Sequence, residues 1–392
     1  MTKNITDTSK PELADRERFR RQMHFQTIDR GVHWEFGYLP ETIERWQNEG
    51  LPPDFDNSGR HSSVEKFFGV DPVLTVPVNM GIFPPFVGEI RILEEKKGKR
   101  VEQLPDGTIQ EVQTEGVHTI PHYIKMAVSS RDDWKRFKER LNPDTPGRTT
   151  VDYKKINDEY RHSKCPVGIS FGSYFGVPRS WIGFEQISLM LYDQLDLVEE
   201  IIETLTALYE RKLEQALSEI EVDFAAGWED ICFRNGPMIS PSMFKNIVAP
   251  RLKRVTSLLK QHGVDVIWTD CDGNINDLVP VWLECGVNCM FPIEVQGGSD
   301  PVELRKKYGR KILLRGGIAK YQLSLGKKAI IKELKRIETV FEEGGYIPHG
   351  DHRIPQDVSY ENYRYYIREK LSMMGWKKYE IERIKGMEKY KP

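Results

Sequence analysis

Short apolar runs alternate with long amphipathic segments from residue 166 onward, and this alternation limits the fold more than any other feature of the sequence. The apolar runs lie at 166–171, 222–230, 264–270, 287–295, 311–318 and 345–351, and a segment with helical periodicity follows each of them. Continuous apolar strands separated by helices are typical of a parallel sheet that is buried on both faces. The sequence therefore predicts six β-then-α units in this region.

Two further strand candidates precede this region. They lie at 32–37 and 72–80, and they bring the expected number of parallel strands to eight. Eight strands close a (β/α)8 barrel, and 392 residues fit one large domain of this class. An open, doubly wound sheet is the alternative, but no GxGxxG motif follows any of the runs. We therefore predict an α/β fold, a (β/α)8 TIM barrel, over residues 1–392.

A segment of different character interrupts the pattern at 92–126. Its β-prone residues surround Pro105-Asp106-Gly107, a strong turn signal, so we expect an inserted β-hairpin that leaves the barrel. Such insertions often cover an active-site mouth, although a decorative hairpin has the same pattern. The tail at 375–392 is polar and basic, which is typical of a surface helix or a frayed end.

The charge composition argues against binding to nucleic acid or to an anionic membrane. The 57 basic and 59 acidic residues give a formal net charge of -2. No apolar run is long enough for a membrane-spanning helix, and the N-terminus has no apolar segment of the signal-peptide type. Five cysteines, an odd number, favour reduced thiols over a disulfide framework. We expect a cytoplasmic protein.

Polar and aromatic residues gather at the carboxyl ends of the expected strands, where the chemistry of a (β/α)8 enzyme lies. For any one of these residues a structural role is about as frequent as a functional one, but their convergence on one face favours an active site. The residues are Trp34, Glu35, Asn79, Ser173, Tyr174, Trp228, Glu229, Asp230, Asp270, Asp272, Glu294, Arg315, His349, Asp351 and His352.

Asp270 and Asp272 stand out in this set. Side chains alternate along a strand, so both carboxylates face the mouth while Cys271 points to the other side. Two neighbouring carboxylates bind a metal cation or share a proton, because like charges raise one of the two pKa values. Capping of the next helix by Asp272 is the structural alternative.

The segment PHGDHRIP (348–355) supplies candidate partners for these carboxylates. Asp270 and Asp272 together with Asp351 or His352 would form an oxygen-rich site suited to zinc, manganese or magnesium. A proton-transfer cluster with His349 or His352 as the acid or base uses the same residues without a metal.

Several stretches of the chain resemble the uroporphyrinogen decarboxylase superfamily. They are DRGVHWEFGYLPETIERW (29–46), the region from WEDICFRNGPMISP to MFPIEV (228–295), LLRGGIAKYQL (313–323) and GGYIPHGDHRIPQDVSYENYRYY (344–366). The resemblance covers most of the chain and implies the (β/α)8 barrel. It also implies one of two activities: decarboxylation of a tetrapyrrole, or cobalamin-dependent methyl transfer.

The motifs favour the methyltransferase branch. The decarboxylases carry an arginine-rich RQAGR segment before YLPE, whereas HWEFGYLPE (33–41) contains no arginine, so a polycarboxylate substrate facing the acidic mouth is disfavoured. The thiol-activating methyltransferases hold zinc on His-x-Cys and a distant Cys, and these ligands correspond to Asp270, Asp272 and a position near Asp351. The different ligands put thiol activation in doubt and leave the substrate-side methyltransferases, which need an acid or Lewis acid and an aromatic pocket.

We therefore expect a methyltransferase that moves a methyl group from a small donor, such as an aryl methyl ether, to a corrinoid on a partner protein. The alternatives are a uroporphyrinogen decarboxylase-like carboxy-lyase and a non-catalytic tetrapyrrole-binding or corrinoid-binding barrel. The resemblance also makes a homodimer plausible. The expected catalytic residues are Asp270, Asp272, Glu229, His349 and His352; the substrate-binding residues are Trp34, Glu35, Tyr174, Trp228, Asn274, Glu294 and Arg315; the ligands of zinc or another divalent metal are Asp270, Asp272, Asp351 and His352.

Overall fold

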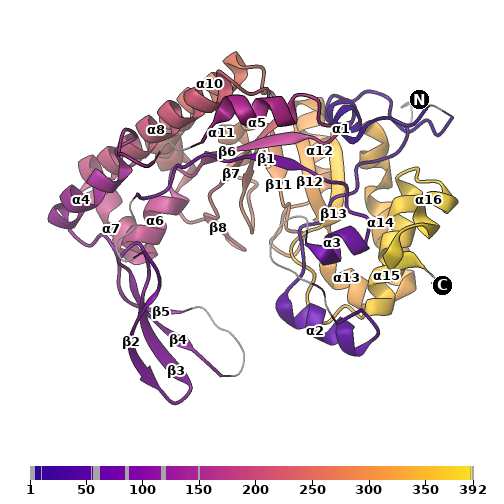
Figure 1. The fold of residues 1–392 in the computed structure, drawn as a ribbon, viewed down its shortest axis with the longest axis horizontal. Helices are drawn as coiled ribbons and strands as arrows, with labels where there is room; N and C mark the ends of the chain where they lie inside the picture. The colour runs from indigo at the N-terminus through magenta and orange to yellow at the C-terminus, as the bar shows by residue number, and fades with distance from the viewer. Residues whose placement is uncertain are drawn as a thin grey trace.

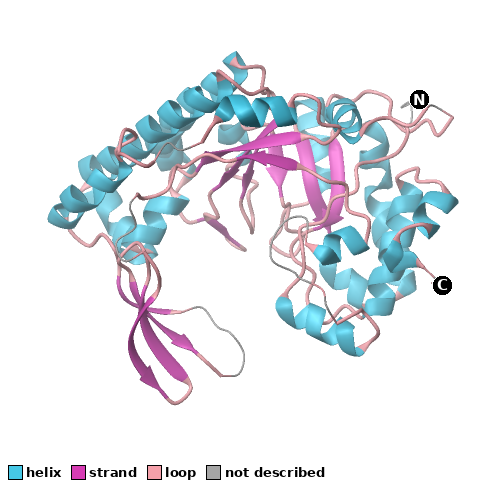
Figure 2. Ribbon diagram, viewed as in Figure 1, coloured by secondary structure: helices cyan, strands magenta, loops and turns pink. Residues whose placement is uncertain are grey.

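A parallel sheet forms the centre of the protein (Figures 1 and 2). The computed structural model describes residues 5–9, 11–53, 55, 62–83, 88–115, 121–148, 151–388 and 390. Within these ranges the sheet has seven strands in the order β1-β6-β7-β10-β11-β12-β13. Their bounds are Leu74–Val76, Val167–Gly172, Phe224–Trp228, Ile267–Asp270, Cys289–Phe291, Leu313–Ile318 and Tyr346–Gly350. The six β-then-α units predicted from residue 166 onward are confirmed.

Helices cover the outer face of the sheet, as Figure 2 shows. Local signals set their ends: the Ser240 hydroxyl accepts the Met243 N–H at 3.2 Å, as expected for a cap before Pro241. Gly183 divides the long helical pattern after β6 into shorter helices. The helices are α1 (Asp15–Met23), α2 (Pro40–Asn48), α3 (Ser63–Phe67), α4 (Arg131–Phe137), α5 (Tyr153–Tyr160), α6 (Gly176–Ile182), α7 (Phe184–Asp193), α8 (Leu195–Leu217), α9 (Pro241–Met243), α10 (Ala249–Gln261), α11 (Val279–Cys285), α12 (Pro301–Tyr308), α13 (Lys320–Ser324), α14 (Lys327–Glu343), α15 (Tyr360–Met373) and α16 (Lys378–Glu382). Short 3-10 turns lie at η1 (Lys138–Leu141), η3 (Gly309–Lys311) and η4 (Lys385–Met387), and a π-helical turn, η2 (Phe244–Val248), precedes α10.

Two apolar clusters show that the sheet curls around a core of its own. The larger cluster packs between the sheet and the helices. A smaller inner cluster takes residues from successive strands, including Phe224, Trp268, Phe291 and Ile347. Phe19 of α1 joins this inner cluster, so α1 closes the end of the barrel at which the strands begin. The opposite end, where the strands finish, holds the polar residues singled out above.

The predicted strand at 32–37 is wrong. These residues, all of which the structure describes, form no strand, and the sheet has seven parallel strands over the described ranges where the sequence predicts eight. Side chains satisfy the backbone here: the Val32 N–H donates to Gln22 Oε1 at 2.8 Å and the His33 N–H donates to Asp71 Oδ2 at 2.8 Å. The segment therefore fills the eighth position without a strand ladder.

The insertion predicted at 92–126 contains more than one hairpin. In its described part, β2 (Arg91–Lys96), β3 (Lys99–Gln103), β4 (Ile109–Gln113) and β5 (His122–Lys125) form a four-stranded antiparallel sheet. This sheet, here called the arm, projects away from the barrel in Figure 1. Asp106 lies in the β3–β4 turn, where its carboxylate accepts the Thr108 N–H at 2.9 Å.

The C-terminal tail packs on the barrel through apolar side chains. Ile381, Ile384 and Met387 are buried in the larger cluster. A short hairpin of β8 (Cys232–Phe233) and β9 (Gly236–Pro237) follows β7. All five cysteines are free thiols. Over the described residues, no helix combines the length and the apolar character needed to span a membrane.

Candidate active site

Asp270 and Asp272 lie together where β10 ends. The inward side of this strand carries Trp268, which belongs to the inner cluster, and period-two alternation places both carboxylates on the same side. Cys271 points outward into the larger cluster and is buried, and its Sγ accepts the Ile231 N–H at 3.3 Å. The structure therefore has the predicted orientation, with Asp270 and Asp272 on one side of the chain and Cys271 on the other.

His352 forms an ion pair with Asp272, with 3.1 Å between Nε2 and Oδ2. Burial on its own would lower the pKa of His352, but the hydrogen bond to Asp272 and its charge outweigh that effect and raise the pKa. In the described part of the chain, Asp272 Oδ1 is buried and accepts no hydrogen bond. This oxygen therefore has unused hydrogen-bonding capacity.

Asp270 has the most informative pKa at the mouth. Burial raises the pKa of its carboxyl to about 7, and the negative charges of Asp272 and Asp230 add to the effect, while His352 and Arg315 oppose it. Near neutral pH this side chain is therefore protonated in a large fraction of molecules and can donate a proton.

Asp230 completes the acidic group. Its backbone is left-handed, with φ of 46°, and Arg179 donates to its carbonyl oxygen and lies 3.6 Å from its carboxylate. Burial and the charge of Asp272 raise the pKa of Asp230, and Arg179 opposes this. Strained backbone of this kind clusters at functional sites.

Asp351, predicted as a metal ligand, has a carboxylate that accepts hydrogen bonds from the protein backbone. Its fully buried carboxylate accepts the Lys320 N–H at 2.9 Å and the Val295 N–H at 3.0 Å. Lys320 Nζ lies 3.1 Å from Glu294, and Glu294 in turn accepts the Gly273 N–H at 3.0 Å. These contacts brace the loops that follow β10, β11, β12 and β13.

The predicted metal ligands do not fit a three-ligand centre in this arrangement. Both oxygens of Asp351 accept backbone N–H groups, and His352 Nε2 is bonded to Asp272. Nowhere in the described ranges do three His, Cys, Asp or Glu side chains come together as a metal site would require.

Glu229 and Tyr174 lie in the protein interior. The Glu229 carboxylate is buried and accepts the N–H groups of Tyr174, Phe175 and Gly176 at 2.7, 2.9 and 2.8 Å, at the start of α6. The Tyr174 hydroxyl is buried and donates to the carbonyl of Phe171 at 3.2 Å. Glu229 thus fixes the loop after β6 with its carboxylate, and its backbone N–H donates to the Asp270 carbonyl at 2.9 Å.

His349 and Arg315 form the floor beneath the mouth. The carbonyl of Gly350 lies 2.8 Å from His349 Nδ1, so this nitrogen carries the proton. Burial and the charge of Arg315 hold the pKa of His349 well below its ordinary value, which leaves a neutral imidazole. The guanidinium of Arg315 lies 4.8, 4.3 and 4.4 Å from the ring centres of Trp34, Trp268 and Phe291.

The other predicted substrate-binding residues take different positions. Trp228 is 37% exposed beside the mouth, whereas Trp34 is buried in the inner cluster. Asn274 shapes the turn after β10, because its Oδ1 accepts the Asn276 N–H at 3.2 Å. Glu35 is buried and pairs with Lys370.

Sequence reasoning missed Arg179 and Lys320. Lys320 lies two positions after the end of β12, so its place after a strand was a usable signal. Arg179 lies within α6, and its contact with Asp230 joins residues that are 51 positions apart, for which the sequence contains no signal.

The fold and this site define an α/β barrel whose polar centre lies at the carboxyl ends of its strands. The model of the family described as uroporphyrinogen decarboxylase (URO-D) matches residues 110–369, and the chain belongs to this family. This confirms the resemblance seen in the sequence. A methyltransferase from Methanosarcina mazei has a similar structure, with a TM-score of 0.54 and 14% identity, over 92% of this chain and 98% of the other. At this identity the similarity concerns the fold. No curated protein sequence matches the chain.

Proposed function

We propose that the protein is a methyltransferase that takes a methyl group from a small O-methyl donor, such as an aryl methyl ether, and passes it to a corrinoid on a partner protein. The observation that carries this proposal is Asp270, a carboxyl with a pKa of about 7 beside the Asp272–His352 pair. The similar fold of a protein named as a methyltransferase supports the same branch of the family.

The chemistry needs an acid at the oxygen that loses its methyl group. Cleavage of the methyl–oxygen bond leaves the bonding electron pair on that oxygen, and protonated Asp270 donates its proton there. The Asp272–His352 pair, which is partly exposed, can return a proton to Asp270 from solvent. When bound, the corrinoid supplies the nucleophile that accepts the methyl group.

The surroundings of Asp270 suit a small planar donor and an external cofactor. The Phe36 ring lies 5.0 Å from the His352 ring, and exposed Trp228 is the residue of β7 that pairs with Asp270 of β10. Phe233, 53% exposed on the hairpin after β7, is near Trp228 in the chain. Exposed aromatic side chains at the mouth fit a cofactor that another protein carries.

The family description favours a second candidate, a tetrapyrrole decarboxylase. The mouth argues against it, because the carboxylates of Asp230, Asp272 and Glu294 would face the carboxylates of such a substrate. The sequence HWEFGYLPE also lacks the arginines that would grip such a substrate.

The test mixes the purified protein with reduced cobalamin and a panel of aryl methyl ethers, and follows cobalamin methylation by its absorbance. We expect methylation by the wild type and a loss of about 100-fold or more for Asp270→Asn, since general acids contribute factors of this size. Asp265→Asn is the matched control, because Asp265 precedes the same strand at its other end and pairs with His24.

Full activity in Asp270→Asn would refute the acid role. Absence of methylation with every donor, together with consumption of uroporphyrinogen, would establish the decarboxylase instead.

A further inference from the structure

The barrel closes through a seam that has no strand ladder. Residues 33–39 join the segment just before β1 to the loop just after β13, the two edge strands of the sheet. On the β1 side, the Asp71 N–H donates to the His33 carbonyl at 2.8 Å. On the β13 side, the Ile354 N–H donates to the Gly37 carbonyl at 3.0 Å, and the Leu39 N–H donates to the Ile354 carbonyl at 3.2 Å. The seam therefore holds the end of the loop after β13.

Glu35 lies at the centre of this seam and has its partners inside the protein. Its side chain is fully buried and forms an ion pair with Lys370 of α15, whose side chain is also fully buried. The Tyr366 hydroxyl donates to Glu35 Oε1 at 3.1 Å, and the Gly350 N–H points to Oε2 at 3.5 Å. Lys370 also donates to the Trp34 carbonyl at 3.3 Å. One carboxylate thus joins the seam, the last helix of the barrel and the start of the loop after β13.

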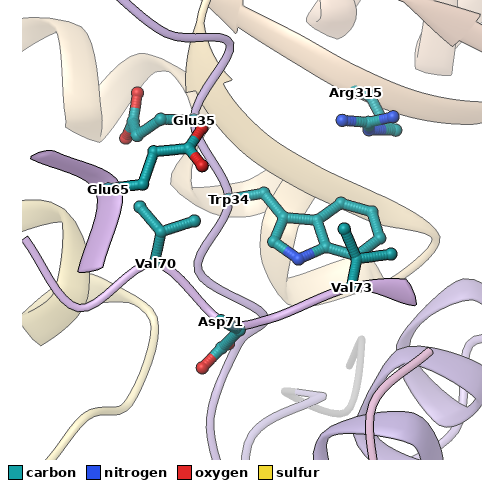
Figure 3. A pocket seen from close by; sticks show the side chains of 7 residues that line it. All are labelled: Trp34, Glu35, Glu65, Val70, Asp71, Val73 and Arg315. Atoms are coloured by element: carbon teal, nitrogen blue, oxygen red, sulfur yellow. The ribbon is translucent and has the colours of Figure 1, made fainter. Parts of the chain in front are cut away.

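A small cavity lies beside Glu35, and charged and polar groups form part of its wall. The cavity has a volume of about 40 Å³ and is lined by Trp34, Glu35, Glu65, Val70, Asp71, Val73 and Arg315 (Figure 3). Without an eighth strand to supply ladder partners and side chains, this part of the wall is less well filled and polar groups line it. Buried polar groups are stable when other groups satisfy them, and the Glu35–Lys370 pair does this across the seam.

We propose that Glu35 and Lys370 form a latch that closes the barrel and positions the loop carrying His352, and that neither residue binds substrate. His352 lies between anchored points of that loop: Glu35 holds Gly350, and Gly37 and Leu39 hold Ile354. The neighbouring Asp351 is held separately, by the backbone N–H groups of Lys320 and Val295. The Asp272–His352 pair forms only when this loop is in place. Release of the latch removes the Glu35 anchor, loosens the loop around Asp351 and weakens the contact of His352 with Asp272. The consequence for turnover rests on the proposed function, whereas the consequence for the loop does not.

The test is amide hydrogen exchange in the full-length protein, measured by mass spectrometry on peptides covering 346–355. The double variant Glu35→Met with Lys370→Met keeps the side-chain volume and leaves no unpaired charge in the interior. We expect the amides of 349–353 to exchange about tenfold faster than in the wild type. Opening of the loop costs less free energy in the double variant, because the contacts of the latch no longer have to be broken.

The matched control is Arg18→Met with Asp29→Leu. Arg18 and Asp29 also form a buried ion pair, with 2.9 Å between Nε and Oδ1, and Arg18 lies on α1 at the other end of the barrel. Exchange at 349–353 should stay at the wild-type rate in this control. Glu35→Gln is the second variant if the double variant does not fold: the amide keeps the shape but offers a single acceptor oxygen to its three donors, so exchange should again increase.

Unchanged exchange at 349–353 in the folded double variant, or in Glu35→Gln, overturns the latch. If methyl transfer is observed, we expect a lower kcat at unchanged KM in the double variant, as for a positioning residue. A loss of kcat/KM that comes entirely from a higher KM would indicate that Glu35 binds substrate. That outcome would also overturn the latch. Faster exchange in a protein that transfers no methyl group in any form supports the latch and refutes the proposed function.

Discussion

At the residue scale, the mouth shows how burial and pairing divide roles among similar side chains. Asp272 forms an ion pair with His352, and Asp230 forms one with Arg179. Burial and the negative charges of these two neighbours raise the pKa of Asp270 to about 7. Asp351 and Glu229 are carboxylates as well, but backbone N–H groups occupy them. Among the described residues, the proposed acid is therefore the carboxyl at the mouth that has no cation of its own.

The pKa of Asp270 predicts a pH-dependent stability. The folded-state pKa lies above the ordinary value of 3.8, so the folded protein holds a proton that the unfolded chain has lost between about pH 4 and pH 7. The free energy of unfolding contributed by this group thus falls as pH rises through that range. We expect Asp270→Asn, which cannot ionise, to exceed the wild type by roughly 2 kcal/mol at pH 8 and by little at pH 4.5.

Urea unfolding of both proteins at the two pH values measures this difference. Asp265→Asn should show no comparable gain at pH 8, since Asp265 pairs with His24, whose hydrogen bond lowers its pKa. A stability difference between Asp270→Asn and wild type that is the same at both pH values would show that Asp270 is ionised throughout.

The hydrogen bonds that Asp351 accepts from the backbone predict how the protein responds to metal removal. Both oxygens of Asp351 are on backbone N–H groups and His352 Nε2 is bonded to Asp272, so two of the four predicted ligands already have protein partners. The two that remain are fewer than the three protein ligands that stable zinc sites use. We expect elemental analysis of protein purified without added metal to find well below one zinc per chain, and chelator to leave activity unchanged. One equivalent of zinc that is lost in Asp272→Ala would show that Asp351 or His352 changes partners when metal binds.

At the element scale, the fold was largely predictable because continuous apolar strands have few alternatives. All six runs from residue 166 onward became strands, and alternation alone placed Asp270 and Asp272 on one side. The segment VHWEFG has the same apolar character, yet Gln22 and Asp71 satisfy its N–H groups and no ladder forms. Partnerships of that kind, like Arg179 with Asp230, join distant positions and leave no periodic pattern in the sequence.

The close approach of β11 and β12 predicts an intolerance at one glycine. Gly316 has φ of 92°, and a Cβ added there would lie 1.8 Å from the Pro292 carbonyl oxygen. Gly326, before α14, has φ of 90° and no neighbour within 4 Å of such a Cβ. We expect Gly316→Ala to lose at least about 3 kcal/mol of unfolding free energy and Gly326→Ala about 1 kcal/mol, the cost of backbone strain.

Thermal unfolding of the two glycine variants checks this difference. Equal losses of unfolding free energy in the two variants would mean that the backbone moves easily to make room at Gly316. The positive φ would then be the whole cost of the substitution at Gly316.

At the scale of the whole molecule, the barrel and the arm differ in how they are held. The barrel combines an inner and an outer apolar cluster with a seam closed by side chains. The arm consists of strands that pair with one another, and β2 and β5 at its edges are exposed along their length. It meets the barrel where the Met126 side chain lies against Gly183, between α6 and α7. Stability should therefore reside in the barrel.

Removal of the arm tests this division. Edge strands β2 and β5 are three strand spacings apart, about 14 Å, so a Gly/Ser linker of about six residues can join Ile90 to Met126. We expect the shortened protein to unfold within about 3 °C of the wild type, because few buried side chains are lost. Turnover with free cobalamin should also be retained if the arm lies outside the mouth.

Truncation after Lys377 is the matched comparison, since it removes a shorter segment that buries Ile381, Ile384 and Met387. Each buried apolar side chain contributes about 2 kcal/mol, so this variant should unfold at a clearly lower temperature than the one without the arm. If the arm deletion is instead the more damaging change, the antiparallel sheet supports the barrel. If the arm deletion keeps the melting temperature but abolishes turnover, the arm belongs to the active site.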